Sequence, residues 1–197
     1  MTTQWDDKFG LLEGVGKDAP IVTNDKGGKQ SESPMALHLI DPTFLHEYFY
    51  ELKQKLEHLD AYDCTQVDKE DEFIYNCYRA IVEIAWFMKF PTSENMLYLD
   101  WALDYLNETD NEIEPIIRIG KVLKEGAEKY KPNNWRLIPQ EEHINHALIH
   151  IVAAIMGDKQ DNHIDHAMCR LMMAKATKKS EGFEYGAYVD SKCTSNT

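Results

Sequence analysis

The chain has 197 residues, of which 43% are hydrophobic, and it carries a formal net charge of −13 at pH 7. This apolar content suits one domain with a core of its own and argues against disorder throughout. The acidic balance argues against a protein that grips a nucleic-acid backbone, which requires a basic face. Small nucleotides remain open as ligands, because a carboxylate-rich site can hold Mg²⁺ beside their phosphates.

Targeting signals and membrane spans are missing from the sequence. No apolar run approaches the ~20 residues that a membrane-spanning helix needs, and residues 1–10 lack a basic segment followed by an apolar one. The four cysteines form no Cys-x-x-Cys pair, which is typical of free thiols in a reducing compartment. We therefore expect a cytoplasmic protein with neither a membrane nor a nucleic acid as its partner.

The two ends of the chain lack hydrophobic periodicity. Residues 1–34 are rich in Gly, Asp, Lys and Ser and are predicted to be a flexible N-terminal arm, and residues 181–197 a flexible tail. No segment shows the alternation that is typical of a strand. The part between them, residues 35–180, is predicted to be a single helical domain.

Helical periodicity fills that domain. The first predicted helix begins at Asp41-Pro42, a cap followed by proline in the first turn, and runs to about residue 59. Five more are predicted over about residues 69–90, 93–107, 114–130, 139–156 and 161–179. We therefore expect an all-α protein, a bundle of about six helices.

Five of the eight histidines lie on the last two predicted helices, each of which carries the motif His-Ile-x-His-Ala. At ~100° per residue their side chains form a polar stripe apart from the apolar face of each helix. A short loop makes the two helices antiparallel neighbours, so we expect the stripes to face each other. Alternatively the histidines are satisfied hydrogen-bonding groups between helices, or the repeat reflects packing symmetry. The stripes consist of His143, His146 and His150 on one helix, and of His163, His166 and Arg170 on the other.

Carboxylates spaced three residues apart precede these stripes. Glu125 and Glu128 lie on one face of the fourth predicted helix, where they can share a divalent cation. Glu142 and Asn145 lie likewise on one face of the fifth. Oxygen ligands that converge from two helices suit Mg²⁺ or Mn²⁺.

Three aspartates near the start of the sixth helix can extend this site: Asp158, Asp161 and Asp165. Asp161 is also well placed to cap the helix. Asp165 points away from the histidine stripe, where a solvated role is the alternative.

The segment between the fourth and fifth helices combines groups that suit a nucleotide. Trp135 offers a face for base stacking, and Asn133 or Asn134 can read a base edge. Lys129 and Arg136 can meet phosphates. The alternative is a loop whose tryptophan closes one end of the bundle.

Residues 125–136, 138–150 and 161–170 together resemble a phage and bacterial family of dATP/dGTP diphosphohydrolase domains. The run Lys26-Gly-Gly-Lys-Gln-Ser31, followed by Leu39-Ile-Asp-Pro42, resembles the opening of that family. The resemblance covers about residues 26–45 and 113–177.

That family is similar to the all-α, MazG-like nucleotide pyrophosphohydrolases, which hold Mg²⁺ by Glu-x-x-Glu on one helix and Glu-x-x-Asp on the next. The resemblance implies Mg²⁺ (or Mn²⁺) at Glu125, Glu128, Glu142 and Asn145, with Asn145 standing where Asp is usual. It also implies a MazG-like core, with residues 46–112 as an inserted helical pair. A homo-oligomer is expected from the resemblance alone, in the host cytoplasm if a phage encodes the chain.

The resulting hypothesis is metal-dependent hydrolysis of purine (deoxy)nucleoside triphosphates to monophosphate and pyrophosphate, acting on the nucleotide pool. Glu142 acts with the metal, and His146 or His150 positions the attacking water or takes its proton. Asp161 is an additional metal ligand. The predicted substrate-binding residues are Lys129, Asn134, Trp135, Arg136, His163, His166 and Arg170.

Two alternatives stay open. One is a nucleotide-binding protein without catalysis, such as a phage counter-defence factor that sequesters a nucleotide. The other is a phosphohydrolase with His and Asp metal ligands, although the sequence lacks an adjacent His-Asp pair and offers only Asp165-His166 in reverse order.

Overall fold

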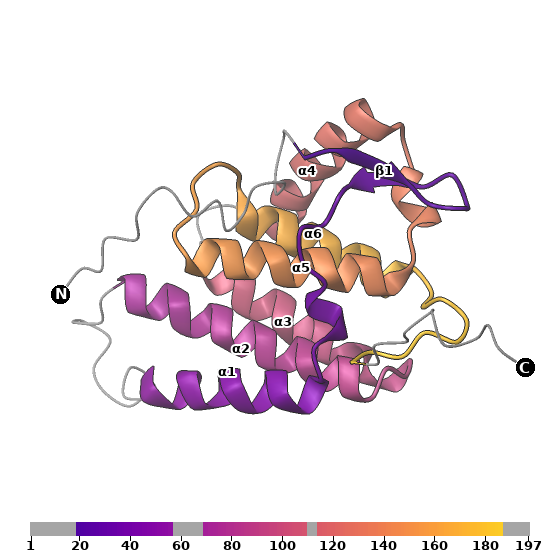
Figure 1. Ribbon diagram of the computed structural model, residues 1–197. Helices are drawn as coiled ribbons and strands as arrows, with labels where there is room; N and C mark the ends of the chain where they lie inside the picture. The colour runs from indigo at the N-terminus through magenta and orange to yellow at the C-terminus, as the bar shows by residue number, and fades with distance from the viewer. Residues whose placement is uncertain (1–18, 57–68, 110–113, 187–197) are drawn as a thin grey trace, which may run out of the picture.

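The computed structural model describes residues 19–56, 69–109 and 114–186. Most of these residues are helical, and the helices form an all-α bundle, as the periodicity predicts (Figure 1). Short 3₁₀ turns precede or join several helices: η1 (Leu37–Leu39), η3 (Glu94–Met96) and η4 (Asn134–Leu137). The six helices of the described part are α1 (Pro42–Leu56), α2 (Lys69–Lys89), α3 (Leu97–Glu108), α4 (Pro115–Tyr130), α5 (Gln140–Ile155) and α6 (His163–Ala176).

The helices form three layers, with the antiparallel pair α5 and α6 in the middle (Figure 1). Helices α2 and α3 pack on one side of this pair, α1 packs on α2, and α4 lies on the other side, against α6. The core between the layers includes Ile84, Phe87 and Leu99 from α2 and α3, and Leu148 from α5, all essentially inaccessible to solvent. Residues 46–112, expected as an insertion, therefore supply much of the core on which α5 rests.

Helix α5 packs closely along α6. Small side chains are completely buried on both helices, at Ala147 and Ala167, and they allow the two backbones to approach. The side chain of Gln140, at the start of α5, donates to the carbonyl oxygen of Ala174 near the end of α6 at 2.9 Å. The pair is therefore fixed in register at that end.

Part of the predicted flexible arm forms a β-hairpin instead. Strands β1 (Ile21–Thr23) and β2 (Lys29–Ser31) pair antiparallel. The side chain of Asn24 organises the turn, because its Oδ1 accepts from the N–H of Gly28 at 2.8 Å, as turn-forming asparagines do. The arm prediction is wrong for residues 19–34, since three-residue strands are too short to show alternation; residues 1–18 lie outside the described residues.

The hairpin is fixed to η4 by hydrogen bonds and a close backbone contact. The amide of Asn134 accepts from the N–H of Lys29 at 2.8 Å and donates to its carbonyl oxygen at 2.5 Å. Asn24 Nδ2 donates to the carbonyl oxygen of Leu137 at 2.7 Å. Gly28 lies so close to Leu137 that a Cβ atom there would stand 2.9 Å from its Cβ and from its carbonyl oxygen.

The segment after α6 also packs against the bundle. Tyr185 is buried, and the N–H of Gly186 donates to the carbonyl oxygen of His38 at 3.2 Å. The tail prediction is therefore wrong for residues 181–186, and residues 187–197 lie outside the described part. Among the helices that the structure describes, none is both long and apolar enough to span a membrane.

Replacing Gly28 with alanine tests the packing of the hairpin against Leu137 of η4. The new methyl group clashes with the backbone of Leu137, so we expect Gly28→Ala to lower the free energy of unfolding by about 1–3 kcal/mol in urea titrations. Gly120, inside α4, is the matched control, since nothing lies within 4 Å of a Cβ atom there. Gly120→Ala should raise stability by about 0.5–1 kcal/mol. Equal stability of Gly28→Ala and the wild type would contradict the packing.

Candidate active site

A cavity of about 830 Å³ lies between the hairpin, α4, η4 and the α5–α6 pair. This volume is in the usual range for small-molecule sites, roughly 300–1,000 Å³. Ten of the predicted site residues line it: Glu125, Glu128, Lys129, Asn134, Trp135, His146, His150, Asp161, His166 and Arg170. Four others do not: Arg136, Glu142, Asn145 and His163.

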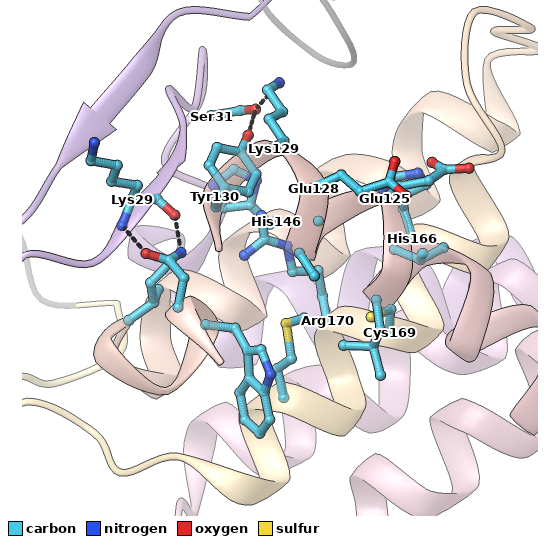
Figure 2. A pocket seen from close by; sticks show the side chains of 18 of the residues that line it. Lys29, Ser31, Glu125, Glu128, Lys129, Tyr130, His146, His166, Cys169 and Arg170 are labelled. Carbon is cyan, nitrogen blue, oxygen red and sulfur yellow. Dashed lines mark hydrogen bonds between the residues drawn. The ribbon is translucent and has the colours of Figure 1, made fainter. Parts of the chain in front are cut away.

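The cavity lining combines carboxylates, hydroxyl groups and a guanidinium. In Figure 2, Glu125 and His166 lie at one side of the view and Ser31 and Tyr130 at the other, with Glu128 and Arg170 labelled nearer the centre. The hydroxyl groups of Ser31 and Tyr130 are 2.7 Å apart, and Ser31 comes from the hairpin. Sequence reasoning assigned neither residue to the site. Ser31 falls in a segment predicted to be a flexible arm, and Tyr130 stands beside Lys129, which was selected for its charge.

Arg170 brings a positive charge deep into the cavity wall. Its Nη1 donates to Nδ1 of His143 at 3.2 Å. Burial lowers the pKa of Arg170 from its ordinary value, while the negative charge of Glu142 acts in the opposite direction, but a guanidinium stays charged in proteins. No carboxylate of the described residues forms an ion pair with it. A partly buried cation in a cavity wall that has no ion-pair partner among the described residues favours an anionic ligand.

His143, which does not line the cavity, hydrogen-bonds to this arginine. Its side chain is completely buried, and its Nε2 lies 3.1 Å from the carbonyl oxygen of Trp135. Burial lowers the pKa of His143 to about 3, and the nearby charge of Arg170 acts in the same direction. The imidazole is therefore neutral at physiological pH.

The two histidine stripes face each other between α5 and α6. Nδ1 of His150 lies 3.0 Å from Nδ1 of His163, and the ring of His166 lies 5.0 Å from that of His150. Nε2 of His146 lies 2.9 Å from the hydroxyl of Ser33, just after the hairpin. Burial holds the pKa values of His146 and His150 well below their usual range. Both are therefore neutral hydrogen-bonding groups at neutral pH.

The aspartates of the sixth helix differ from their expected roles. Asp161 is not the cap, a position taken by Asn162; its carboxylate lies 3.2 Å from Nε2 of His166, and this hydrogen bond holds the pKa of Asp161 well below its usual range. Asp165, for which solvation was the alternative, is buried and pairs with Nε of Arg118 at 2.5 Å. Arg118 is the only buried residue of α4, and nothing in the sequence singled it out.

The predicted set of metal ligands does not assemble. Glu125 and Glu128 line the cavity, but the amide of Asn145 donates to the carbonyl oxygen of Met35 at 2.9 Å and accepts from the N–H of His38. Asn145 therefore anchors the chain that follows the hairpin. Its ligand role is corrected, because its amide groups are already engaged with backbone.

Glu142 is also engaged outside the cavity lining, where its carboxylate accepts from Nε2 of Gln30 at 3.1 Å. Within the described ranges, no three His, Cys, Asp or Glu side chains are arranged to hold a metal ion. As arranged, the predicted four-residue set does not fit Mg²⁺ or Mn²⁺.

Of the residues predicted to recognise a nucleotide between α4 and α5, Asn134 and Trp135 line the cavity and Arg136 does not. Trp135 lines the cavity. The guanidinium of Arg136 lies 4.4 Å from the centre of the Trp135 ring, so Arg136 covers that ring and does not line the phosphate-sized space. Asn134 lines the cavity, and its amide both accepts from and donates to the main chain of Lys29, so this side chain fixes the hairpin in place.

The geometry thus places the chain in the class of all-helical bundle proteins, with a cavity whose helical walls are α4, α5 and α6. Residues 112–184 match the family described as dATP/dGTP diphosphohydrolase, N-terminal. This match confirms the family resemblance over residues 113–177. It spans α4 through α6, while α1 to α3 and the hairpin lie outside it. No curated protein and no solved structure matches the chain.

Restoring the expected aspartate at position 145 tests the reassignment of Asn145. An aspartate cannot donate to the carbonyl of Met35 and sets a charge against it, so Asn145→Asp should lower the free energy of unfolding by about 1–3 kcal/mol. Asn76, equally buried on α2, provides the control variant Asn76→Asp, which tests whether the loss is general to buried amides. A gain in Mg²⁺ affinity at unchanged stability, measured by calorimetry and urea unfolding, would restore the metal-ligand role.

Stability should fall as the pH drops below neutrality. In the folded chain the pKa values of His143, His146 and His150 lie below the ordinary 6.5, so the unfolded chain binds more protons below pH 6.5. Stability is then full above that pH and is lost toward the folded pKa, which is about 3 for His143, by up to about 1.4 kcal/mol per pH unit for each histidine. Urea unfolding at pH 7.5, 6.0 and 5.0 measures this, and a flat profile would contradict it.

Proposed function

We propose that the cavity binds a purine deoxynucleoside triphosphate and that the protein hydrolyses it to the monophosphate and pyrophosphate. The observation that carries the proposal is the partly buried guanidinium of Arg170, which has no carboxylate partner among the described residues and lies in a nucleotide-sized cavity. The matched family, whose description names dATP and dGTP, supports the substrate class. The acidic surface of the chain is compatible with this, because the anion meets a local positive charge rather than a basic face.

The proposed binding mode follows the lining of the cavity. Arg170 and Lys129 meet the phosphate chain, and the base stacks on Trp135, on the ring face that Arg136 leaves uncovered. Removing the base and the phosphates from bulk water strengthens both contacts.

The proposed proton transfer involves the histidine that a carboxylate orients. Asp161 accepts from Nε2 of His166, which leaves Nδ1 of His166 able to accept a proton from the attacking water. In that step water adds to phosphorus, the bond to the leaving pyrophosphate breaks, and the water proton ends on the imidazole. His146 and His150, with their lowered pKa values, position water instead of taking its proton.

Metal dependence stays a prediction. Because the predicted ligand set does not form, no step of the reaction is assigned to a metal ion. We keep Mg²⁺ (or Mn²⁺) as the expected cofactor, together with homo-oligomeric assembly and a role in the nucleotide pool of a phage or bacterium.

Incubation of the purified protein with each dNTP tests the proposal. We expect pyrophosphate and monophosphate from dATP or dGTP with Mg²⁺ or Mn²⁺, and no product with EDTA. Arg170→Gln removes the charge-assisted contacts to phosphate and should lower kcat/KM by about 30- to 150-fold, or about 2–3 kcal/mol. Arg79→Gln is the control, because Arg79 stacks on Tyr105 away from the cavity. Absence of turnover with every nucleotide and metal would sink the enzymatic function.

Binding without hydrolysis is the second candidate. The engagement of Asn145 with the backbone favours it, since the metal site of the related hydrolases is not reproduced here. Calorimetry that shows tight nucleotide binding, with the nucleotide recovered unchanged, would establish it. Release of triphosphate or orthophosphate would instead indicate a phosphohydrolase of another type.

A further inference from the structure

His143 does not line the cavity, yet it contacts two groups that do. Its side chain is completely inaccessible to solvent, its Nε2 lies 3.1 Å from the carbonyl oxygen of Trp135, and its Nδ1 lies 3.2 Å from Nη1 of Arg170. We propose that His143 is a positioning residue that fixes the stacking ring of Trp135 and the phosphate-binding charge of Arg170 relative to each other. The inference rests on the proposed function for the identity of the ligand.

The chemistry of the two partners determines which nitrogen of His143 carries the proton. The Trp135 carbonyl can only accept, so Nε2 of His143 must donate to it. A neutral imidazole has one N–H, and therefore Nδ1 presents a lone pair to the guanidinium of Arg170. Protonation of Nδ1 would place an N–H group against the N–H group of Arg170. Each contact thus requires the same neutral tautomer.

A neutral partner also explains why the charge of Arg170 remains available. A carboxylate in the place of His143 would orient the guanidinium but would neutralise it. The imidazole orients Nη1 and leaves the net positive charge for a ligand. The remaining N–H groups of Arg170 have no protein acceptor among the contacts of the described residues. The site is therefore oriented before an anion arrives, which reduces the entropy that binding costs.

The two contacts of His143 can be removed separately. In His143→Gln the side-chain amide nitrogen reaches the position of Nε2 and still donates to the Trp135 carbonyl, but Nδ1 is lost. In His143→Asn the side-chain oxygen takes the position of Nδ1 and still accepts from Arg170, but the contact to Trp135 is lost. A purely structural histidine would give the two variants similar behaviour.

Two ligands report on the two contacts. Inorganic tripolyphosphate has no base and reports on Arg170, whereas α,β-methylene-dGTP adds the base and resists cleavage between the α- and β-phosphates. By calorimetry, we expect His143→Gln to weaken both ligands by about tenfold, the loss of one charge-assisted orienting contact. We expect His143→Asn to bind tripolyphosphate within about threefold of the wild type and to lose about tenfold of its preference for the nucleotide.

The matched control is His38→Gln, because His38 is similarly buried and its ring stacks on Phe183 outside the cavity. It should leave both affinities unchanged. Equal losses for both ligands in the two His143 variants, or no loss in either, would overturn the inference while the proposed function stands. A wild-type protein that binds neither ligand would overturn the proposed function, and the inference with it.

A measurement on the unaltered protein covers the case in which the variants fold poorly. The ¹⁵N shifts of the His143 ring at pH 7 should show a neutral imidazole protonated at Nε2, and its Nδ1 resonance should move when tripolyphosphate binds. A ring protonated at Nδ1, or one whose resonances ignore the ligand, would overturn the inference.

Discussion

The antiparallel contact between α5 and α6 is the constraint on which the rest of the molecule depends. Helix α5 is buried on both sides, because Leu148 and its apolar neighbours pack on the layer of α2 and α3 while the histidines face α6. Completely buried alanines, such as Ala147 and Ala167, let the two backbones approach. This closeness brings side chains from opposite helices within hydrogen-bond distance, including His150 with His163 and His143 with Arg170.

Burial between these helices sets the electrostatics of the cavity. Desolvation keeps His143, His146 and His150 uncharged, so Arg170 is the charge that dominates the region between α5 and α6. A buried histidine cluster that took up protons would repel that arginine. The neutral imidazoles instead supply hydrogen-bonding groups near the Arg170 guanidinium, which is compatible with an anionic ligand even though the chain as a whole has a net charge of −13.

Two asparagines that the sequence suggested as ligand-binding groups instead hold the hairpin and the chain after it. The resemblance predicted a metal ligand at position 145, yet here the Asn145 amide donates to one backbone group and accepts from another. Similarly, the amide of Asn134 accepts from the N–H of Lys29 and donates to its carbonyl oxygen. Both asparagines attach the N-terminal segment to the helical part of the chain, Asn134 from η4 and Asn145 from α5.

The sequence alone determined the helices and the facing histidine stripes, because both follow from local periodicity: the apolar spacing of α2 and α5, and the repeat of His-Ile-x-His-Ala. It also placed the family resemblance over residues 26–45 and 113–177, and the family match at residues 112–184 covers the second of these ranges. Only the tertiary structure decided what the polar groups do. The roles of Asn145, Asp165 and His143 depend on Met35, Arg118 and Arg170, each at least 27 residues away in the chain, and periodicity carries no information about partners at such separations.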